Sequence, residues 1–308
     1  MNYRSLQAPS SVVMVRPHRF AVNPQTGADN AFQAEPAAQS EALAAAALAE
    51  FDAAVTALTA AGITVHSFED FGELDTPDSV FPNNWFSTHH GGRVAIYPMF
   101  AVNRRRERRS DVIELLKAQY RVQEVIDYSG LEYDNLFLEG TGAMVFDNAE
   151  RVAYVAASHR ADPVILERFC TAFGYEPMVF PTADATGRPI YHTNVLMSVA
   201  TDYALICLDA IADARRRDEV AQRLAESGRT VLQISFDQVN DFVGNAIELT
   251  GSDRRLLVLS ARAEAALTPA QREVVTASSR LLPLAIPTIE LAGGSARCMI
   301  AGVHLSPR

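Results

Sequence analysis

The sequence contains almost no lysine and little cysteine, and each shortage argues against some chemistry. Its only lysine among 308 residues, Lys117, lies in a helix-like stretch with no glycine-rich loop before it. A P-loop or a Schiff-base cofactor would have to use this lysine, so P-loop, kinase-like and pyridoxal-phosphate chemistries are not expected. The three cysteines, an odd number, form no disulfide framework and fit a reducing cytosol.

Net positive charge is lacking as well. The chain has 27 basic and 37 acidic side chains, which give a formal net charge of −10. Because binding to a phosphate backbone needs a clustered basic surface, no nucleic-acid partner is expected. The basic run 104–109 also contains Glu107 and predicts a solvated helix start rather than such a surface.

A signal peptide and a membrane span are not predicted either. Residues 1–10 are polar and have no apolar centre. The most apolar long stretch, 41–63, is rich in alanine and contains Glu50 and Asp52, whereas a span needs about 20 strongly apolar residues. The pattern predicts a soluble helix, no membrane partner and a cytoplasmic protein.

What the sequence does contain is a recurring order of β-type and helical segments. Five units of roughly 50–60 residues predict a ββαβ repeat, in which the final run 296–303 could complete the first unit. No linker rich in Gly, Pro or Ser interrupts the chain, so we expect one domain over 1–308, with 23–39 as its only long loop. The expected strands are 11–15, 63–65, 79–81, 93–97, 122–126, 142–146, 152–156, 178–180, 193–199, 203–208, 230–234, 245–249, 255–259 and 282–286; the expected helices are 40–61, 105–119, 214–226 and two that begin at Pro163 and Pro269.

Several helix ends carry specific signals. Gly62 follows the first helix, where a C-terminal glycine is common. Asp162 before Pro163 is typical of a helix start, and Thr268 to Gln271 fits a capping box. A repeat of this kind predicts an α/β fold, either a closed five-bladed propeller, which would protect its sheet edges, or an ordinary α/β sandwich.

Cys298 has the most unusual context of the three cysteines. It follows Gly293-Gly294-Ser295, which predicts a tight turn, and Arg297 adjoins it. A neighbouring cation favours the thiolate, which is the reactive form, whereas the alternative is a buried strand cysteine. Cys170 and Cys207 lie in helical and apolar strand patterns and are predicted to belong to the core.

Three further segments carry candidate site residues. His192 opens an apolar run with Asn194 two residues later, so a strand would put both on one face, although a capped strand end explains His192 equally well. Glu139 precedes Gly-Thr-Gly, and a partly buried carboxylate there would need a partner such as histidine. Asn84 follows Asn83 beside the only tryptophan, in a Pro-Asn-Asn sequence that also suits a turn. No histidine shows metal-ligand spacing, and the pair His89-His90 predicts a solvated loop; no metal or cofactor is expected.

Together and in this order, these motifs resemble the guanidine-modifying pentein superfamily, which includes arginine deiminases, dimethylargininases and amidinotransferases. The likeness extends from Val12 to Val303 and is closest to the arginine deiminase-related branch, which includes citrulline hydrolases. It implies a five-bladed α/β propeller of ββαβ repeats. The motifs are Asp78-x-x-Phe81-x-Asn83-Asn84, Leu138-Glu139-Gly140, His192-x-Asn194 and Gly293-Gly294-Ser295-x-Arg297-Cys298.

The resemblance also implies an active site. In the family a cysteine is the nucleophile, a histidine the general acid and base, and an acidic residue its partner. The matching residues are Cys298, His192 and Glu139. The same fold includes a ribosome anti-association factor that catalyses nothing, but a binding protein would not need these three residues together. An amidinotransferase is another alternative and would need room for an amine acceptor.

Two positions differ from the deiminases, where carboxylates hold the guanidinium. Here they are Asn84 and Asn194. A guanidinium offers only donors and a positive charge, whereas a neutral ureido group offers an acceptor oxygen and donor nitrogens, which an amide can match. This difference favours citrulline, hydrolysed to ornithine, carbon dioxide and ammonia. An arginine dihydrolase, which releases ornithine and two ammonia molecules, is the second expectation, and an arginine deiminase the third.

The expected partner is a small amino-acid substrate, and its α-carboxylate needs a cation. Arg160 resembles the arginine of the Ser-x-Arg segment that binds this carboxylate in deiminases. Arg297 could bind substrate or assist the thiolate, and Asp78 could bind the substrate amine or orient Asn84. A homo-oligomer is compatible with all of these expectations.

Overall fold

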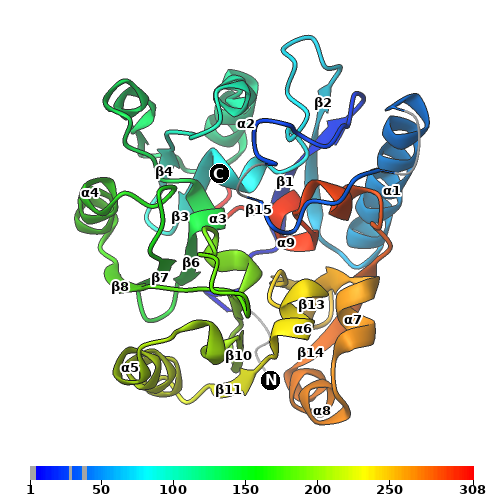
Figure 1. Ribbon diagram of the computed structural model, residues 1–308. Helices are drawn as coiled ribbons and strands as arrows, with labels where there is room; N and C mark the ends of the chain where they lie inside the picture. The colour runs from blue at the N-terminus through cyan, green and yellow to red at the C-terminus, as the bar shows by residue number, and fades with distance from the viewer. Residues whose placement is uncertain (1–4, 28–29, 37–39) are drawn as a thin grey trace.

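The computed structural model describes residues 5–27, 30–36 and 40–308. Within this part the fold is mixed α/β, with five separate three-stranded sheets (Figure 1). Their strand orders are β15-β1-β2, β3-β4-β5, β6-β7-β8, β9-β10-β11 and β12-β13-β14. The strands are β1 (Ser11–Pro17), β2 (Thr64–Asp70), β3 (Phe86–His89), β4 (Arg93–Ile96), β5 (Glu124–Asp127), β6 (Met144–Asp147), β7 (Val152–Ala156), β8 (Glu176–Phe180), β9 (Met197–Val199), β10 (Tyr203–Ile206), β11 (Thr230–Gln233), β12 (Ile247–Thr250), β13 (Arg255–Ser260), β14 (Ser279–Leu284) and β15 (Ala301–Gly302).

All five sheets follow one plan. In each sheet an inner strand runs antiparallel to the middle strand. A helical crossover leads from the middle strand to an outer strand, which runs parallel to the middle one. The α-helices are α1 (Ser40–Ala60), α2 (Ser110–Gln119), α3 (Gly140–Ala143), α4 (Pro163–Phe173), α5 (Ala214–Ala225), α6 (Phe236–Asn240), α7 (Ala261–Ala266), α8 (Pro269–Ser278) and α9 (Ala296–Met299). The short 3₁₀ segments are η1 (Pro82–Asn84), η2 (Asn103–Glu107), η3 (Ser129–Asp134), η4 (Thr193–Val195), η5 (Leu208–Ala210) and η6 (Ile289–Ala292).

The C-terminal run completes the first sheet, as the sequence predicts. Strand β15 pairs antiparallel with β1, with Val12 opposite Gly302 and Val13 opposite Ala301. It therefore takes the position that β3, β6, β9 and β12 take in the other sheets. Segments from the two ends of the chain thus share one sheet.

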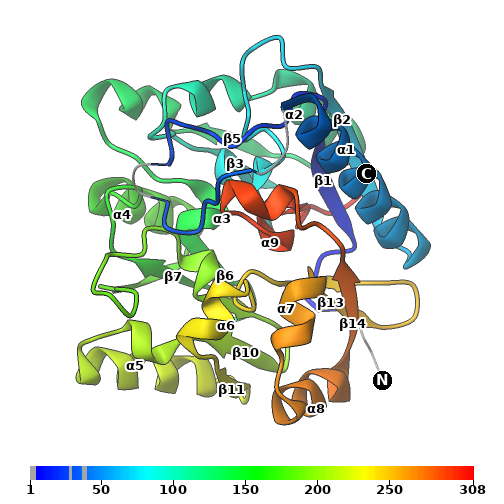
Figure 2. The ribbon, with the colours of Figure 1, turned by 45° about the vertical axis from the view of Figure 1, so that its right-hand side comes forward.

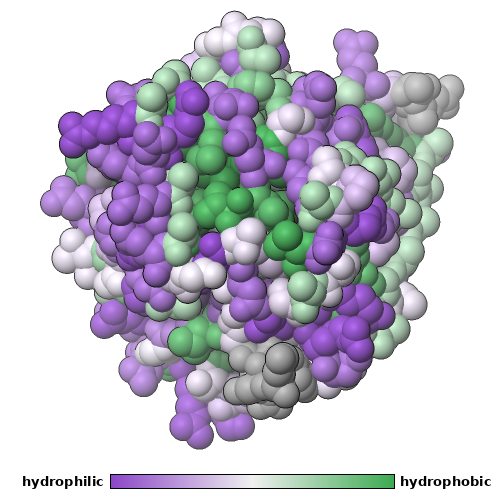
Figure 3. Space-filling model, turned by 90° about the horizontal axis from the view of Figure 1, so that it is seen from below, coloured by the Kyte–Doolittle hydropathy of each residue, from purple (hydrophilic) through white to green (hydrophobic). Residues whose placement is uncertain are grey.

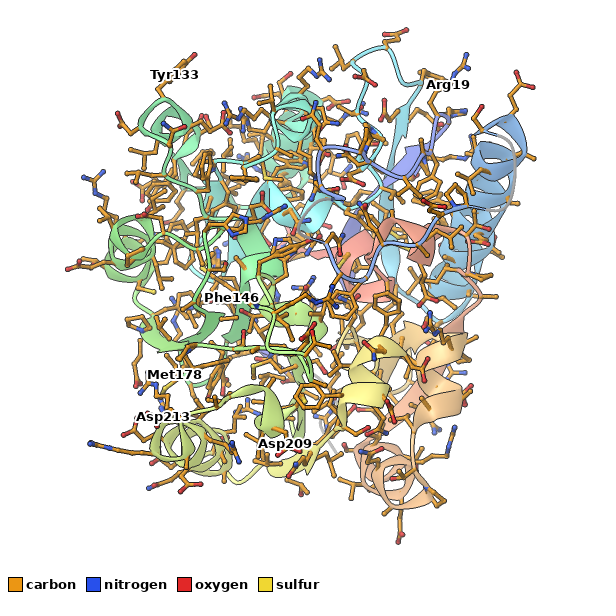
Figure 4. All side chains as sticks on the ribbon, viewed as in Figure 1. Arg19, Tyr133, Phe146, Met178, Asp209 and Asp213 are labelled. Carbon is orange, nitrogen blue, oxygen red and sulfur yellow. The ribbon has the colours of Figure 1, made fainter. Side chains whose placement is uncertain are left out.

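The long helices lie outside and the first strands inside. Helices α1, α2, α4, α5 and α8 lie around the edge of the molecule, whereas α3 and α9 lie towards its middle (Figure 1). Figure 4 likewise shows Phe146 of β6 nearer the middle than Met178 of β8. The turns that lead into the first strands are therefore brought towards one another.

The buried apolar residues of the described chain form five clusters, and each cluster joins neighbouring sheets. The joining pairs are Val13 with Val94 for the first and second sheets, Ala95 with Ala153 for the second and third, Tyr154 with Ala204 for the third and fourth, Leu205 with Leu257 for the fourth and fifth, and Val258 with Val12 for the fifth and first.

On the surface, the face seen from below has a hydrophobic area in its middle, framed by hydrophilic residues (Figure 3).

Helix α1 packs lengthwise beside β1, as Figure 2 shows. Its buried side chains are spaced three to four residues apart and include Leu43, Phe51 and Leu58. Glu50 accepts hydrogen bonds from the backbone of residues 288–289, and Asp52 pairs with Arg16. By length and composition alone the helix could cross a membrane, a property that it shares with core helices of soluble proteins.

The helix ends that the sequence marks are confirmed. The side chain of Asp162 accepts hydrogen bonds from the backbone N–H groups of Val164 and Ile165 at the start of α4. Thr268 and Gln271 form both bonds of a capping box at α8. Gly62 adopts φ +87°, which disfavours any side chain.

Several local predictions were wrong. Residues 79–81 form no strand but lead through a turn into η1, and the expected strands 142–146 and 193–199 begin with one-turn helices. The run 104–109 is not fully solvated, because Arg104 and Glu107 are buried and ion-paired. His89 is buried among aromatic rings rather than solvated. Of the predicted loop 23–39, residues 28–29 and 37–39 lie outside the described residues.

Candidate active site

The predicted site residues lie on short helical turns that precede the inner strands. Segment η1 contacts α3 and α9, and α3 also contacts η4. These turns carry or adjoin Asn84, Glu139, Asn194 and Cys298, from four different sheets. The repeat therefore brings together residues that are more than 200 positions apart in the sequence.

A pocket of about 150 Å³ opens over these turns. Its lining includes six of the eight predicted site residues, and Glu139 is buried directly behind the lining residue His192. Residues 184–191 supply another part of the wall. The six lining residues are Asp78, Asn84, Arg160, His192, Asn194 and Cys298.

Glu139 and His192 form a buried pair. The imidazole Nε2 lies 2.7 Å from Glu139 Oε2, and Glu139 has no exposed surface. Burial alone would raise the pKa of Glu139, but the Arg160 charge and the bond to His192 outweigh burial and hold that pKa well below its usual range. Glu139 is therefore ionised, and an ionised acceptor places the imidazole proton on Nε2.

The imidazole itself is poised to take a proton. Burial lowers the pKa of His192, and the hydrogen bond to Glu139 only partly opposes this shift. At neutral pH the ring is therefore neutral, with Nδ1 as its acceptor. A neutral histidine backed by a carboxylate can accept a proton and then donate it, as general acid-base catalysis requires.

Cys298 lies between two amide donors. Its Sγ is 3.2 Å from Asn194 Nδ2 and 3.2 Å from Asn245 Nδ2, and the residue is 5% exposed. Asn245 Oδ1 in turn accepts a bond of 3.0 Å from the backbone N–H of Arg297. Two N–H donors directed at sulfur stabilise negative charge there, so the setting suits a nucleophilic thiolate.

Asn245 is a site residue that the sequence analysis missed. It ends the turn before β12, just as Asn84 ends η1 before β3, so a comparison of the five units at this position would have found it. The expected strand 245–249 included Asn245 but gave it no role. Its partner Cys298 is 53 residues away in the sequence.

Asn84 is oriented by a second missed residue, Arg104. With the amide oriented so that both its atoms are satisfied, Asn84 Oδ1 accepts bonds of 2.9 and 3.2 Å from the Arg104 guanidinium. This orientation leaves the amide nitrogen on the side of Gly142, and Asn84 itself lines the pocket. Arg104 is itself held by Glu107 at 2.8 Å. Asn84 therefore presents a donor to the pocket, and Arg104 keeps it turned that way.

Asp78 and Asn194 contribute acceptors. Oδ1 of Asp78 and Oδ1 of Asn194 are buried and have no hydrogen-bond partner among the described residues. Asp78 Oδ2 accepts a bond of 2.8 Å from Asn23. Burial raises the pKa of Asp78, against the charge of Arg104 nearby. An unpartnered buried oxygen in a pocket lining is costly unless a ligand donates to it.

Glycines allow these residues to approach one another. A Cβ on Gly142 would lie 2.1 Å from the side-chain amide of Asn84 and 3.0 Å from the imidazole of His192. A Cβ on Gly294 would lie 2.8 Å from the ring of Phe81 and 3.2 Å from Cβ of Cys298. Both glycines therefore leave space that the site uses, and neither belongs to a nucleotide-binding loop.

The two predicted arginines have different positions. Arg160 lines the pocket, pairs with Glu139 at 3.2 Å and lies over the ring of Tyr191. Arg297 does not line this pocket, although it adjoins Cys298; its Nη1 donates to the backbone of Ile300 at 2.8 Å, and its side chain faces a second cavity. Arg297 therefore lies apart from the other predicted substrate-binding residues, and its predicted role stays a prediction. Among the described residues, no group of three or more His, Cys, Asp and Glu could hold a metal ion.

Comparisons with known proteins give one family and a shared fold. A family model described as N,N dimethylarginine dimethylhydrolase, eukaryotic, matches residues 16–305. No curated protein sequence matches significantly. The fold is shared with the N-terminal domain of ArgZ bound to substrate, an arginine dihydrolase from the ornithine-ammonia cycle in cyanobacteria (TM-score 0.71, 15% identity, 96% of this chain and 99% of that chain).

Two more solved structures have the same fold. One is AgrE in complex with L-arginine (TM-score 0.70, 16% identity, 94% of this chain and 39% of that chain). The other is a dimethylarginine dimethylaminohydrolase variant as an adduct with S-methyl-L-thiocitrulline (TM-score 0.64, 14% identity, 95% of this chain and 99% of that chain).

Proposed function

The chain belongs to the family of N,N dimethylarginine dimethylhydrolase, eukaryotic, within the guanidine-modifying pentein superfamily, and from this premise we propose that it hydrolyses arginine to ornithine through a covalent bond to Cys298. From the sequence, citrulline is the first expectation and arginine the second. The order is reversed here because relatives that share the fold include arginine dihydrolases. The observation that carries the proposal is the setting of Cys298, between two amide donors in a pocket with a His192–Glu139 pair.

We infer that the five sheets are the blades of a five-bladed α/β propeller and that residues 1–308 form one domain. Each core cluster joins neighbouring sheets, and the last of them joins the fifth sheet to the first. Strand β15 supplies the inner strand of the first sheet from the other end of the chain. A cytoplasmic location and assembly into a homo-oligomer stay predictions.

In the proposed first hydrolysis, the Cys298 thiol gives its proton to His192 and the sulfur attacks the guanidinium carbon. A C–S bond forms, and the π electrons move to nitrogen. The imidazolium, stabilised by Glu139, protonates a terminal nitrogen, so that the C–N bond breaks and ammonia leaves. A water molecule then gives a proton to His192, and its oxygen bonds to the same carbon.

The second hydrolysis acts on a carbon that now bears oxygen. If the C–S bond broke at once, citrulline would leave and the enzyme would be a deiminase. Loss of a second ammonia instead leaves a thiocarbamate on Cys298, and a second water releases the carbamate of ornithine, which decomposes to ornithine and carbon dioxide. The sum is arginine and two waters giving ornithine, carbon dioxide and two ammonia molecules. The donor of Asn84 and the unpartnered acceptor of Asn194 suit the oxygen and nitrogen of this ureido-like stage.

Citrulline is the second candidate substrate, and the same two amides favour it. A free ureido group offers the one acceptor and the donors that Asn84 and Asn194 match, without a positive charge to neutralise. The substrate α-carboxylate would bind Arg160, as predicted from the sequence, and the substrate amine would bind Oδ1 of Asp78.

The test is to incubate the protein separately with arginine, citrulline and N,N-dimethylarginine and to quantify ornithine, citrulline and ammonia. We expect ornithine and ammonia in a 1:2 ratio from arginine. If ornithine formed from citrulline but not from arginine, citrulline would become the first candidate substrate. Accumulation of citrulline would indicate a deiminase or a dimethylargininase. No product from any of the three substrates would overturn the proposal. The variant Cys298→Ala should be inactive, whereas Cys170→Ala, which changes a buried core cysteine, should keep the activity.

A further inference from the structure

A second cavity lies behind the segment that carries Cys298. It has a volume of about 50 Å³, and all five inner strands contribute to its lining. A few water molecules or one small ion would fit in this space. The lining residues used below are Ser198, Glu248, Arg297 and His304.

Arg297 brings a positive charge into this cavity. Its side chain makes one hydrogen bond within the described part of the chain, to the backbone of Ile300, and no carboxylate there lies within ion-pair distance of it. Burial lowers the pKa of Arg297 to about 10, which still leaves the guanidinium charged at neutral pH. A guanidinium has five N–H donors, so most of those of Arg297 have no partner among the described residues.

Among the described residues of the lining, Glu248 is the one carboxylate, and it is already engaged. Oε1 of Glu248 accepts from Ser279 at 2.8 Å and pairs with Arg255 at 3.2 Å, while Oε2 accepts two bonds from Thr201. Glu248 therefore does not serve as the counter-charge of Arg297.

Two polar atoms of the lining lack partners. The hydroxyl of Ser198 and Nδ1 of His304 are buried without hydrogen bonds among the described residues. Burial lowers the pKa of His304 to about 3, so the ring is neutral. A cation together with a free hydroxyl donor is the donor set of an anion site, and a partly buried charge without a counter-charge favours the binding of an anion.

We propose that this cavity binds one small monovalent anion, of the size of chloride or bicarbonate, on the Arg297 guanidinium and the Ser198 hydroxyl, and that the bound anion lowers the reactivity of Cys298. Arg297 adjoins Cys298 in the sequence, and its backbone N–H donates to Asn245, whose side-chain amide donates to the sulfur of Cys298. A cation near sulfur favours the thiolate, and an anion on that cation cancels part of the effect. The site is thus an inhibitory one on the far side of the nucleophile, and it does not depend on which substrate the pocket takes.

The test measures alkylation of Cys298 by iodoacetamide in the absence of substrate. Sodium gluconate, whose anion is too large for the cavity, is replaced stepwise by chloride, and in a second series by bicarbonate, at constant ionic strength. Mass spectrometry of the Cys298 peptide gives the rate, and the buried Cys170 and Cys207 report unfolding. We expect a saturable decrease of about fivefold, the lower end of usual coupling between sites. A response to only one anion identifies the ligand, and no response to either overturns the proposal.

Variants separate the site from a general salt effect. Arg297→Gln should alkylate more slowly and lose the anion response, whereas Arg297→Lys should retain a response. The same chloride dependence in Arg297→Gln as in the wild type would overturn the proposal. Ser198→Ala, which removes only a hydroxyl, is the second variant and should weaken the response even if the Arg297 variants do not fold.

Crystals of the wild-type protein soaked in sodium bromide give an independent readout. We expect an anomalous bromide peak between the Arg297 guanidinium and Ser198. Water alone in the cavity at saturating bromide would overturn the site.

Discussion

The ionised state of Glu139 depends on contacts that meet on one carboxylate. The backbone N–H of Phe100 donates to Oε1 at 3.0 Å, while Arg160 and His192 hold Oε2. Without them, a carboxylate that has no exposed surface would be protonated. With them, Glu139 supports a positive charge on His192 at the moment when the imidazole takes a proton.

Glu139→Gln tests this pair, because it keeps the size of the side chain and removes its charge. We expect kcat to fall on the order of 10²- to 10⁴-fold. Since Glu139 raises the pKa of His192 against burial, the acidic limb of the kcat–pH profile should move to lower pH. The folded-state pKa of Glu139 is lowered, so the stability from its charge is present above its unfolded pKa and is lost as the pH falls. The variant should lack this part of the acid-induced destabilisation.

Glu132→Gln is the matched control for this prediction. Glu132 also accepts a backbone N–H, from Met99 at 2.8 Å, and pairs with Arg108, but it does not line the pocket. It should change stability and leave the shape of the kcat–pH profile unchanged. A shifted profile in Glu132→Gln, or an unshifted one in Glu139→Gln, would contradict the assigned pair.

Asn84→Asp tests the discrimination between ureido and guanidinium groups. The carboxylate would pair with Arg104 and present an acceptor where the wild type presents a donor. One mismatched polar contact costs about 1–3 kcal/mol, so with arginine as substrate the ratio of ornithine to citrulline should fall roughly tenfold. Chromatography of the products gives this ratio. Asn240→Asp adds the same charge at an exposed position of the pocket lining and should leave the ratio unchanged.

At the scale of elements, the site is made by the turns before the inner strands. Their length is three to four residues, as in η1, α3 and η4. Each turn changes the direction of the chain and aims one side chain at the middle, and the strand after it anchors the turn in a sheet. The close contacts between turns require residues without a side chain at the crossing points.

Gly142→Ala tests such a crossing point. Its Cβ would overlap the amide of Asn84 and touch the imidazole of His192. Since neither group can move without loss of its partner, we expect about 1–3 kcal/mol of destabilisation and about a 100-fold loss of kcat. Gly130→Ala in η3 is the control, because a Cβ there meets nothing within 4 Å. If both variants retained full activity in steady-state assays, the overlap would have no catalytic consequence.

The elements also show why some features could be predicted from the sequence and others could not. Helices α4 and α8 have capping residues and enough length for a 3.6-residue period, so the sequence specifies them locally. Turns such as α3 and η4 have no period to detect, and their apolar residues were therefore predicted as parts of strands. Asn245 was missed because its role depends on Cys298, which belongs to another sheet, and Arg104 was missed because its role depends on a side-chain contact with Asn84, 20 residues away.

At the scale of the whole molecule, the core is distributed rather than central. Each of the five apolar clusters joins neighbouring sheets, and the cavity behind Cys298 takes its lining from all five inner strands. Large exposed side chains such as Tyr133 point away from this arrangement, as Figure 4 shows. A sheet that lost its place would therefore disturb both of its neighbours and the site between them.

Leu205→Ala tests whether the five sheets unfold as one domain. Leu205 lies fully buried in β10, in the cluster between the fourth and fifth sheets, whereas the only tryptophan, Trp85, lies in the cluster between the first and second. The substitution should cost about 2–5 kcal/mol. If the sheets unfold together, the Tm reported by Trp85 fluorescence should fall by several degrees and coincide with the Tm from circular dichroism. Leu74→Ala removes an exposed side chain and should leave both values unchanged. If the Tm reported by Trp85 were unchanged in Leu205→Ala, the chain would consist of independently folding parts. Residues 1–308 would then not be one domain.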